Sequence, residues 1–145
     1  MPEAFLEIAD WLDATYEALS VNDIDLFLTA FAPDARWTSL GQTTQLPFVG
    51  ARIGHRAIRE MIDLIYAEFK MRDFFIEDII ANGNAAAVRW SAMATSHATG
   101  QQSQIEVFDH IIIADRRIVS LTQFFDTAAV ATTAGILKSV KAHAG

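Results

Sequence analysis

The first part of the chain repeats its hydrophobic positions at the three- and four-residue spacing of α-helices. One apolar stripe runs through Phe5, Ile8, Leu12, Tyr16 and Leu19. This periodicity predicts an amphipathic helix over residues 3–20. A second helix is expected to begin at Asn22, which favours the N-cap, with Asp23 and Asp25 in the first turn, where the helix dipole stabilises negative charge. We expect Pro33 to end it.

The second half of the chain changes to the two-residue period of β-strands. A third helix is expected after Gly54, and the helical period ends near residue 72. Strands are predicted at 35–40, 73–81, 85–97, 103–113 and 117–126, and a polar loop at 41–47. Turn residues at 82–84, 99–101 and 115–116 join the last four strands into an antiparallel meander. An alanine-rich helix is expected over 128–141, capped by Asp126.

Helices followed by strands are typical of an α+β fold, and 145 residues fit a single domain over 1–145. Several strands are apolar on both faces, as in Phe74-Phe75-Ile76 and Ile111-Ile112-Ile113. A sheet with one face in water would alternate more regularly. We therefore expect one face to cover the helices and the other to meet the C-terminal helix or a second copy of the chain, which predicts a homodimer.

Composition removes several classes of function. The chain has no cysteine, which excludes disulfides, thiolate catalysis and cysteine metal sites. A net charge of −7 without a basic stripe argues against a nucleic-acid partner. No apolar run reaches the roughly 20 residues that span a bilayer, and residues 1–10 lack the basic start of a signal peptide. These features favour a cytoplasmic protein with no membrane partner.

Asp109 is the most informative single residue, because it is a carboxyl flanked by apolar residues inside a predicted central strand. Burying a lone carboxylate is costly, so such a group either finds hydrogen-bond donors or takes up a proton. This leaves two interpretations open, a functional carboxyl in a pocket and a structural one that is satisfied by neighbouring donors.

Several segments together resemble the nuclear-transport-factor-two-like superfamily, which includes ketosteroid isomerases, SnoaL-like polyketide cyclases and limonene epoxide hydrolases. The resemblance covers nearly the whole chain. The segments are 22–25 (NDID), 30–35 (AFAPDA), 54–60 (GHRAIRE), 108–110 (FDH), 117–121 (RIVSL) and 124–126 (FFD). It implies a curved antiparallel sheet wrapped over three N-terminal helices, forming a cone with one deep, mostly apolar pocket for a small molecule, and a short C-terminal helix.

Strand parity then decides which side chains face that pocket. The family counterpart of Asp109 points inward, and Val107 and Ile111 would point inward with it, leaving Phe108 and His110 on the opposite face. The position of Asp109 is similar to that of the acidic residue in the oxyanion hole of ketosteroid isomerases. That residue is a carboxyl that its apolar surroundings keep protonated.

The rest of the isomerase set is missing from this chain. The tyrosine of that family's first helix corresponds to Thr15, next to Tyr16, and its general base corresponds to Ser39. A serine without a base cannot abstract a carbon-bound proton at useful rates, which argues against that reaction. Two positions remain open for Tyr16, because it lies on the apolar stripe: it reaches inward, or its ring packs with the hydroxyl at the rim of the fold. The second is the simpler expectation.

Arg89 is the second candidate, because it lies within a run of small apolar residues and falls where limonene epoxide hydrolases have an arginine. The two carboxylates of that family correspond to Ser91 and Gln123, and its tyrosine corresponds to Trp37, so its water-activating pair is absent. An inward Arg89 would pair with Asp109 or bind an anionic group. An outward Arg89 would lie in a subunit contact.

The sequence therefore favours a small, apolar ligand, with Asp109 and Arg89 as the catalytic candidates. Further side chains are expected to contact the ligand, namely Thr15, Tyr16, Trp37, Ser39, Ser91, Val107, Leu121, Gln123 and Phe125. We expect no metal and no cofactor, since the four histidines have no metal-ligand spacing and no phosphate-binding glycine loop is present.

Three functions remain open. The first is an enzyme of isomerase, cyclase or dehydratase type that acts on an apolar cyclic or carbonyl-containing metabolite through acid/base chemistry at Asp109. The second is a non-catalytic domain that binds a hydrophobic ligand. The third is a protein-interaction module that uses the sheet face, which is the least favoured because a dimer already explains that face.

Overall fold

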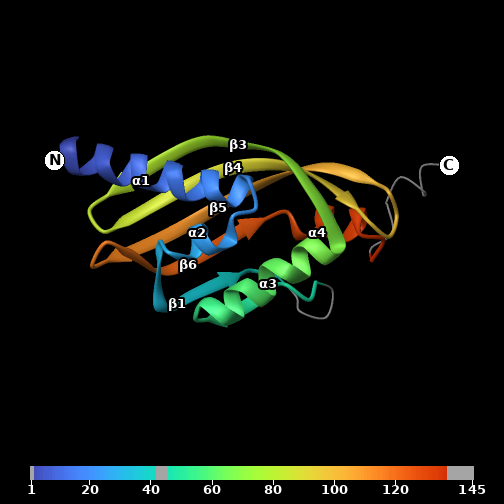
Figure 1. Cartoon of the computed structure of the whole chain (residues 1–145). Coiled ribbons are helices and arrows are strands. Elements are labelled where there is room, and N and C mark those ends of the chain that lie inside the picture. The colour runs from blue at the N-terminus through green and yellow to red at the C-terminus, as the bar shows by residue number, and fades with distance from the viewer. Residues whose placement is uncertain (1, 42–45, 137–145) are drawn as a thin grey trace.

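The computed structural model describes residues 2–41 and 46–136. The helices α1 (Pro2–Ser20), α2 (Ile24–Leu28) and α3 (His55–Glu68) lie against one side of a curved sheet, and α4 (Thr127–Thr133) follows the last strand (Figure 1). The strands are β1 (Phe31–Ser39), β2 (Gly50–Ile53), β3 (Phe69–Asn82), β4 (Ala85–Ser96), β5 (Gln102–Ala114) and β6 (Arg117–Phe125). The α+β class and the cone expected from the sequence are confirmed.

The sheet is mixed rather than wholly antiparallel. Its six strands run in the order β2-β1-β6-β5-β4-β3, and β1 pairs with β6 in parallel, whereas every other pair is antiparallel. The three predicted hairpin turns join β3 to β6 as expected. The short β2 was not expected, because four residues give too little periodicity to be recognised in sequence.

Two helix boundaries differ from the predictions. Asp23, not Asn22, is the N-cap of α2, because its carboxylate accepts a bond from the backbone N–H of Leu26, while Asn22 has a left-handed φ of 60°. Pro33 lies inside β1 and does not end the helix. The β1–β6 register shifts between Phe31 and Arg36, so Pro33 falls in an irregular stretch where its missing N–H is tolerated.

Strand β3 follows α3 without a loop and bends along its length. The N–H of Phe69 still bonds the Ile65 carbonyl, although Phe69 already has an extended backbone. The β3–β4 pairing shifts register between Arg72 and Phe75 and again between Ile76 and Asp78. Such irregularities increase the local bend and twist of a strand, which helps β3 to wrap over the helices.

The C-terminal helix is shorter than predicted. Asp126 caps it as expected by accepting a bond of 3.0 Å from the N–H of Ala129. The helix ends at Thr133, and Gly135 follows with a left-handed φ of 83° that favours glycine. The predicted extension over 137–141 and most of the predicted loop 41–47 lie outside the described residues, as does the side chain of Phe5.

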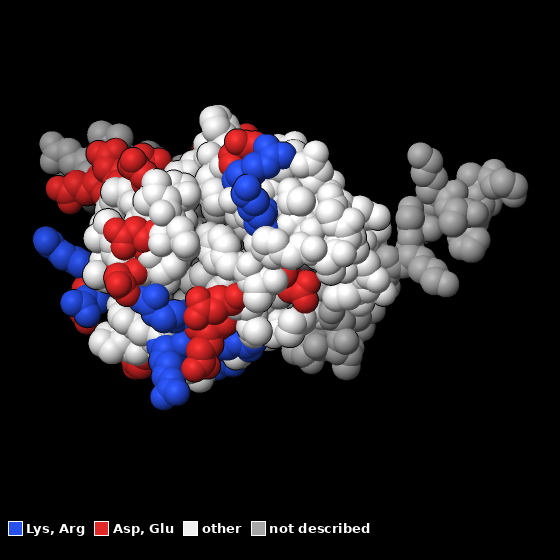
Figure 2. Space-filling view, turned by 45° about the vertical axis from the view of Figure 1, so that its right-hand side comes forward, with Lys and Arg blue, Asp and Glu red and all other residues white. Residues whose placement is uncertain are grey.

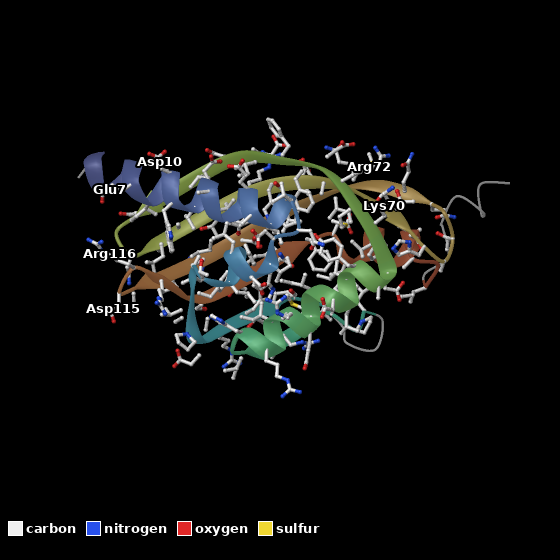
Figure 3. All side chains as sticks on the ribbon, in the orientation of Figure 1. Glu7, Asp10, Lys70, Arg72, Asp115 and Arg116 are labelled. Carbon is white, nitrogen blue, oxygen red and sulfur yellow. The ribbon has the colours of Figure 1, made fainter. Side chains whose placement is uncertain are left out.

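Charged side chains are found at the periphery of the molecule. Figure 3 shows Lys70 and Arg72 at one end of β3 and Asp115 and Arg116 at the β5–β6 hairpin at the opposite end. On the face drawn in Figure 2, acidic and basic groups lie close to one another among larger uncharged areas. No helix of the described residues is long and apolar enough to cross a membrane.

Candidate functional site

A mostly apolar pocket lies between the end of α1, the helix α3 and the inner face of the sheet. It encloses about 670 Å³, including the solvent at its open mouth. Its walls are formed by Leu19, Trp37, Phe48, Met61, Ile62, Ile65, Tyr66, Phe69, Met71, Phe74, Trp90, Ile105, Val107, Gln123, Phe125 and Val130. Gln123 provides an amide among these hydrocarbon and aromatic groups. An apolar cleft with few polar groups is the usual form of a small-molecule site.

Asp109 lies on β5 next to this pocket and is 0% exposed. Its Oδ2 atom accepts two hydrogen bonds, one of 2.5 Å from the Tyr16 hydroxyl and one of 2.9 Å from the Trp90 indole Nε1. Its Oδ1 atom has no hydrogen-bond partner within the described residues. Two donors on Oδ2 leave no room for a proton there, so the proton of the neutral acid belongs on Oδ1.

Burial raises the pKa of Asp109 from 3.8 to about 6. Loss of hydration disfavours the carboxylate, and the Tyr16, Trp90 and Gln123 side chains only partly offset this by lowering the pKa. The pKa of Tyr16 is raised well above its ordinary value by burial and then by the adjacent carboxylate, so Tyr16 remains a hydrogen-bond donor. Asp109 therefore changes between neutral acid and carboxylate at a mildly acidic pH.

Tyr16 points inward from α1, which corrects the expectation that its hydroxyl lies at the rim. Its ring is buried among other aromatic rings, with centroids 6.3 Å from both Phe27 and Trp90. Trp90 in turn stacks on Phe74 at 5.3 Å. This packing fixes both donors to Asp109 through the core rather than through a loop.

Three further polar side chains, Trp37, Ser39 and Gln123, are joined by hydrogen bonds beside Asp109. The Trp37 indole donates to Ser39 Oγ at 3.0 Å, and the Ser39 hydroxyl donates to Gln123 Oε1 at 3.1 Å. Gln123 stands directly opposite Asp109 in the β5–β6 register. Gln123 and Trp90 line the pocket, whereas Asp109 lies behind them, so these two side chains separate the carboxyl from the pocket space.

Arg89 does not lie in the pocket, and its expected pairing with Asp109 is absent. It is on the outer face of the sheet, its side chain is 51% exposed, and its Nη2 is 2.9 Å from Glu106 Oε1. Val88, not Arg89, is registered with Asp109, so alternation along β4 turns Arg89 outward and Trp90 inward. The sequence prediction missed Trp90 as a pocket residue because it left the face of Arg89 open. With Arg89 on the outer face, strand alternation places Trp90 on the inner face.

Five predicted ligand contacts also lie outside the pocket wall, namely Thr15, Tyr16, Ser39, Ser91 and Leu121. Ser91 has the outward parity of Arg89 and donates to Glu77 Oε1 at 3.2 Å. Thr15 is buried, and its hydroxyl bonds its own helix at the Trp11 carbonyl. Leu121 is fully buried in the core and does not line the pocket. Ser39 acts behind the wall through Gln123.

The remaining predicted side chains are where the sequence placed them. Trp37, Val107, Gln123 and Phe125 line the pocket, and Asp109 has the inward parity expected for β5. Phe108 and His110 are exposed on the opposite face. The described residues hold no group of three His, Asp or Glu side chains that could bind a metal ion.

A second hollow was not expected from the sequence. It lies between α1 and the strands β3 and β4, and it shares Phe74 and Trp90 with the pocket. Asp13, Glu17 and Ser20 give it a polar rim. The stacked Phe74 and Trp90 rings thus stand between the two hollows.

The fold and the site together place the chain in a known family. The model of the SnoaL-like domain matches residues 12–121, and the chain belongs to this family. No curated protein matches the chain in sequence.

Solved structures share the nuclear-transport-factor-two-like fold. The chain is similar to TerC co-crystallised with polyporic acid, with 20% identity, a TM-score of 0.80 and coverage of 88% of this chain and 97% of TerC. It is also similar to a protein of unknown function from Burkholderia pseudomallei, with 24% identity, a TM-score of 0.76 and coverage of 82% and 90%. A third neighbour, from Jannaschia, is provisionally named a SnoaL-like polyketide cyclase and has 14% identity, a TM-score of 0.70 and coverage of 86% and 91%.

Proposed function

We propose that this protein is an enzyme that binds an apolar cyclic or carbonyl-containing metabolite in the pocket and acts on it through acid/base chemistry at Asp109. The observation that carries the proposal is the fully buried carboxyl with a pKa of about 6, held directly behind the pocket wall. The name of the Jannaschia neighbour and the co-crystallisation of TerC with polyporic acid support such a proposal.

A single carboxyl is sufficient for one class of reaction. To reach Asp109, the reacting part of the substrate has to enter between the Trp90 and Gln123 side chains, which stand between the carboxyl and the pocket. In the neutral form, Oδ1–H then gives its proton to a substrate oxygen, and the carboxylate takes a proton from a substrate carbon. The enzyme thereby returns to its starting state, and the substrate is isomerised or cyclised without a second base. A pKa near the working pH favours both transfers, since neither protonation state is rare.

The reacting part of the substrate belongs at the wall formed by Trp90 and Gln123, because these side chains contact both the pocket and Asp109. The aromatic and aliphatic side chains of the wall fit the hydrocarbon part of the ligand. Arg89 has no place in this chemistry because it is on the other face of the sheet.

A non-catalytic binding domain is the second candidate. It is favoured by the fact that Asp109 itself does not line the pocket and is already bonded to Tyr16 and Trp90. In that case the carboxyl would only orient the two aromatic residues, and the pocket would hold its ligand unchanged.

Incubation with a small-molecule cell extract, followed by untargeted mass spectrometry, separates the two functions. We expect the wild type to convert a carbonyl-containing compound into an isomer or a dehydrated product. Asp109→Asn should slow this conversion by about 10²-fold or more while retaining the compound, since general acid–base catalysis contributes about that much. The control variant Arg89→Gln should convert it at the wild-type rate.

Equal conversion by Asp109→Asn would reject Asp109 as the acid. A compound that co-purifies with the wild type and with Asp109→Asn, and that neither protein changes, would favour the binding domain.

A further inference from the structure

We propose that Gln123 selects the ligand by presenting a fixed hydrogen-bond donor, so that the ligand oxygen at this wall is an acceptor, as in a ketone or quinone, and not a hydroxyl. The proposal rests on the proposed function only in using the same pocket. It assigns a specificity-determining role to the hydrogen bonds that join Trp37, Ser39 and Gln123.

The hydrogen bonds among Trp37, Ser39 and Gln123 run in one direction, from the indole to the amide. The indole N–H of Trp37 can only donate, so the Ser39 oxygen accepts this bond of 3.0 Å. The single hydroxyl hydrogen of Ser39 is then free for another partner. Gln123 Oε1 at 3.1 Å is the stronger acceptor, since the other group nearby is the Met61 thioether at 4.0 Å. The carbonyl end of the Gln123 amide is therefore directed at Ser39.

The bond that Gln123 Oε1 accepts also decides where the amide nitrogen of Gln123 lies. With Oε1 held by Ser39, the NH₂ group forms the free end of the side chain. Gln123 stands opposite Asp109, and its side chain lowers the pKa of that carboxyl, although no hydrogen bond joins it to Asp109 Oδ1 within the described residues. A flipped amide would set a carbonyl against the carboxylate and leave the Ser39 hydroxyl facing an N–H group. Both ends of the side chain thus favour the same orientation.

The orientation of the Gln123 amide decides which ligand oxygen can bind at this wall. Gln123 is surrounded in the wall by side chains such as Val107 and Phe125, which offer no hydrogen-bond partner. A ligand carbonyl placed against Gln123 accepts a bond from the amide and has no hydrogen of its own to satisfy. A hydroxyl held on the pocket side of Gln123 finds no acceptor for its hydrogen there, because Gln123 Oε1 is held by Ser39 and Asp109 lies behind the wall. Leaving a buried donor unsatisfied is costly.

Three probes with one carbon skeleton test this preference, namely α-tetralone, α-tetralol and tetralin. Their dissociation constants are measured by isothermal titration calorimetry. The wild type should bind the ketone about 10-fold more tightly than either of the others, which is the order expected for one buried hydrogen bond. Gln123→Met keeps the length of the side chain but lacks the amide, so the three affinities should become similar.

Ser39→Ala tests the orientation itself. Without the Ser39 hydroxyl, the amide loses its fixed direction, and the preference for the ketone over the alcohol should fall to about one half or less. Ser91→Ala is the matched control, because it removes a serine hydroxyl that donates to Glu77 on the outer face of the sheet, away from the pocket. Its preference should equal that of the wild type.

The proposal is overturned if the wild type does not favour α-tetralone, or if the preference survives in Gln123→Met or unchanged in Ser39→Ala. Gln123→Leu supplies the same comparison if thermal unfolding shows that the methionine variant is not folded. These affinities involve no turnover, so they are independent of the Asp109→Asn result. Loss of the catalytic role would leave the ketone preference in place, and loss of the preference would leave the catalytic role in place.

Discussion

At the scale of the residue, Asp109 determines the character of the site. It is a carboxyl with two donors on one oxygen and none within the described residues on the other. The donors lower the cost of the charge but do not remove it, and burial is the larger effect, so the pKa of Asp109 is raised. Ionisation of Asp109 therefore lowers the free energy of unfolding of the protein.

Asp109→Asn should change how the stability depends on pH. The asparagine oxygen can still accept from Tyr16 and Trp90, and its NH₂ group takes the place of the unpartnered Oδ1. Because the folded-state pKa of Asp109 is raised from 3.8 to about 6, the wild type loses stability as the pH rises through this interval and then levels off. The free energy of unfolding of the variant relative to the wild type should thus rise by about 3 kcal/mol in total.

Urea unfolding of both proteins between pH 4.5 and pH 8 measures most of this change. A constant difference across that range would show that the pKa of Asp109 is not raised. A variant that is destabilised by several kcal/mol at pH 8 would show that the carboxylate is the stabilising form.

Tyr16→Phe removes the shorter of the two bonds to Asp109 and little else. A hydrogen bond to a charged group contributes about 1.5–3 kcal/mol, and one to a neutral group about 1 kcal/mol. The variant should therefore lose more stability at pH 8, where Asp109 is ionised, than at pH 5, and the pKa of Asp109 should rise further. An equal loss at both values of pH would contradict this account, with the measurement again made by urea unfolding.

At the scale of the element, strand alternation explains most of what the sequence could and could not predict. The parity of β5 was taken from the family resemblance, in which the counterpart of Asp109 points inward, and it correctly placed Val107, Asp109 and Phe108. The parity of β4 could not be derived in the same way, because its small residues around Arg89 fit either face. Tyr16 shows the same limit, since its position on the apolar stripe did not reveal a buried acceptor on a distant strand.

Elements without local periodicity were also beyond the sequence. The four residues of β2 and the parallel pairing of β1 with β6 depend on contacts between distant segments. Pro33 is a similar case, because a proline usually ends a helix and only the register shift in β1 allows it within a strand. The N-cap of α4 at Asp126 depends on local geometry alone, and it was predicted correctly.

Neighbouring residues of β4 should respond very differently to substitution. Trp90→Ala removes a buried indole that stacks on Phe74 and donates to Asp109, and such truncations cost about 3–5 kcal/mol. Arg89→Ala removes a solvent-exposed ion pair with Glu106 and should leave the free energy of unfolding nearly unchanged. Thermal and urea unfolding measure both, and a large loss in Arg89→Ala would place that side chain in a buried contact.

At the scale of the whole molecule, the outer face of the sheet leaves large apolar side chains uncovered among its polar ones. Phe108 and Phe124 are registered partners on this face and are 42% and 45% exposed, and Ile80 is 56% exposed on β3. The helix α4 packs toward the pocket side through Val130, which lines the pocket, so it leaves Phe108 and Phe124 open. We propose that a second copy of the chain covers this face.

Sedimentation equilibrium at micromolar concentration should therefore give the mass of a dimer. Phe108→Glu should produce a monomer by placing a charge in the contact. Leu26→Glu is the matched control, because Leu26 is also an exposed apolar residue, at 56%, but lies on α2. A wild-type monomer, or dissociation by both substitutions, would contradict the proposed contact.

The proposed chemistry depends most directly on the protonation of Asp109, which carbon NMR reports through the carboxyl carbon of ¹³C-labelled aspartate. The Asp109→Asn variant identifies the signal by its absence. We expect a titration midpoint of about 6, well above the ordinary value of 3.8. A midpoint at or below that ordinary value would mean a carboxylate that is ionised throughout the working range, and it would contradict the role of Asp109 as an acid.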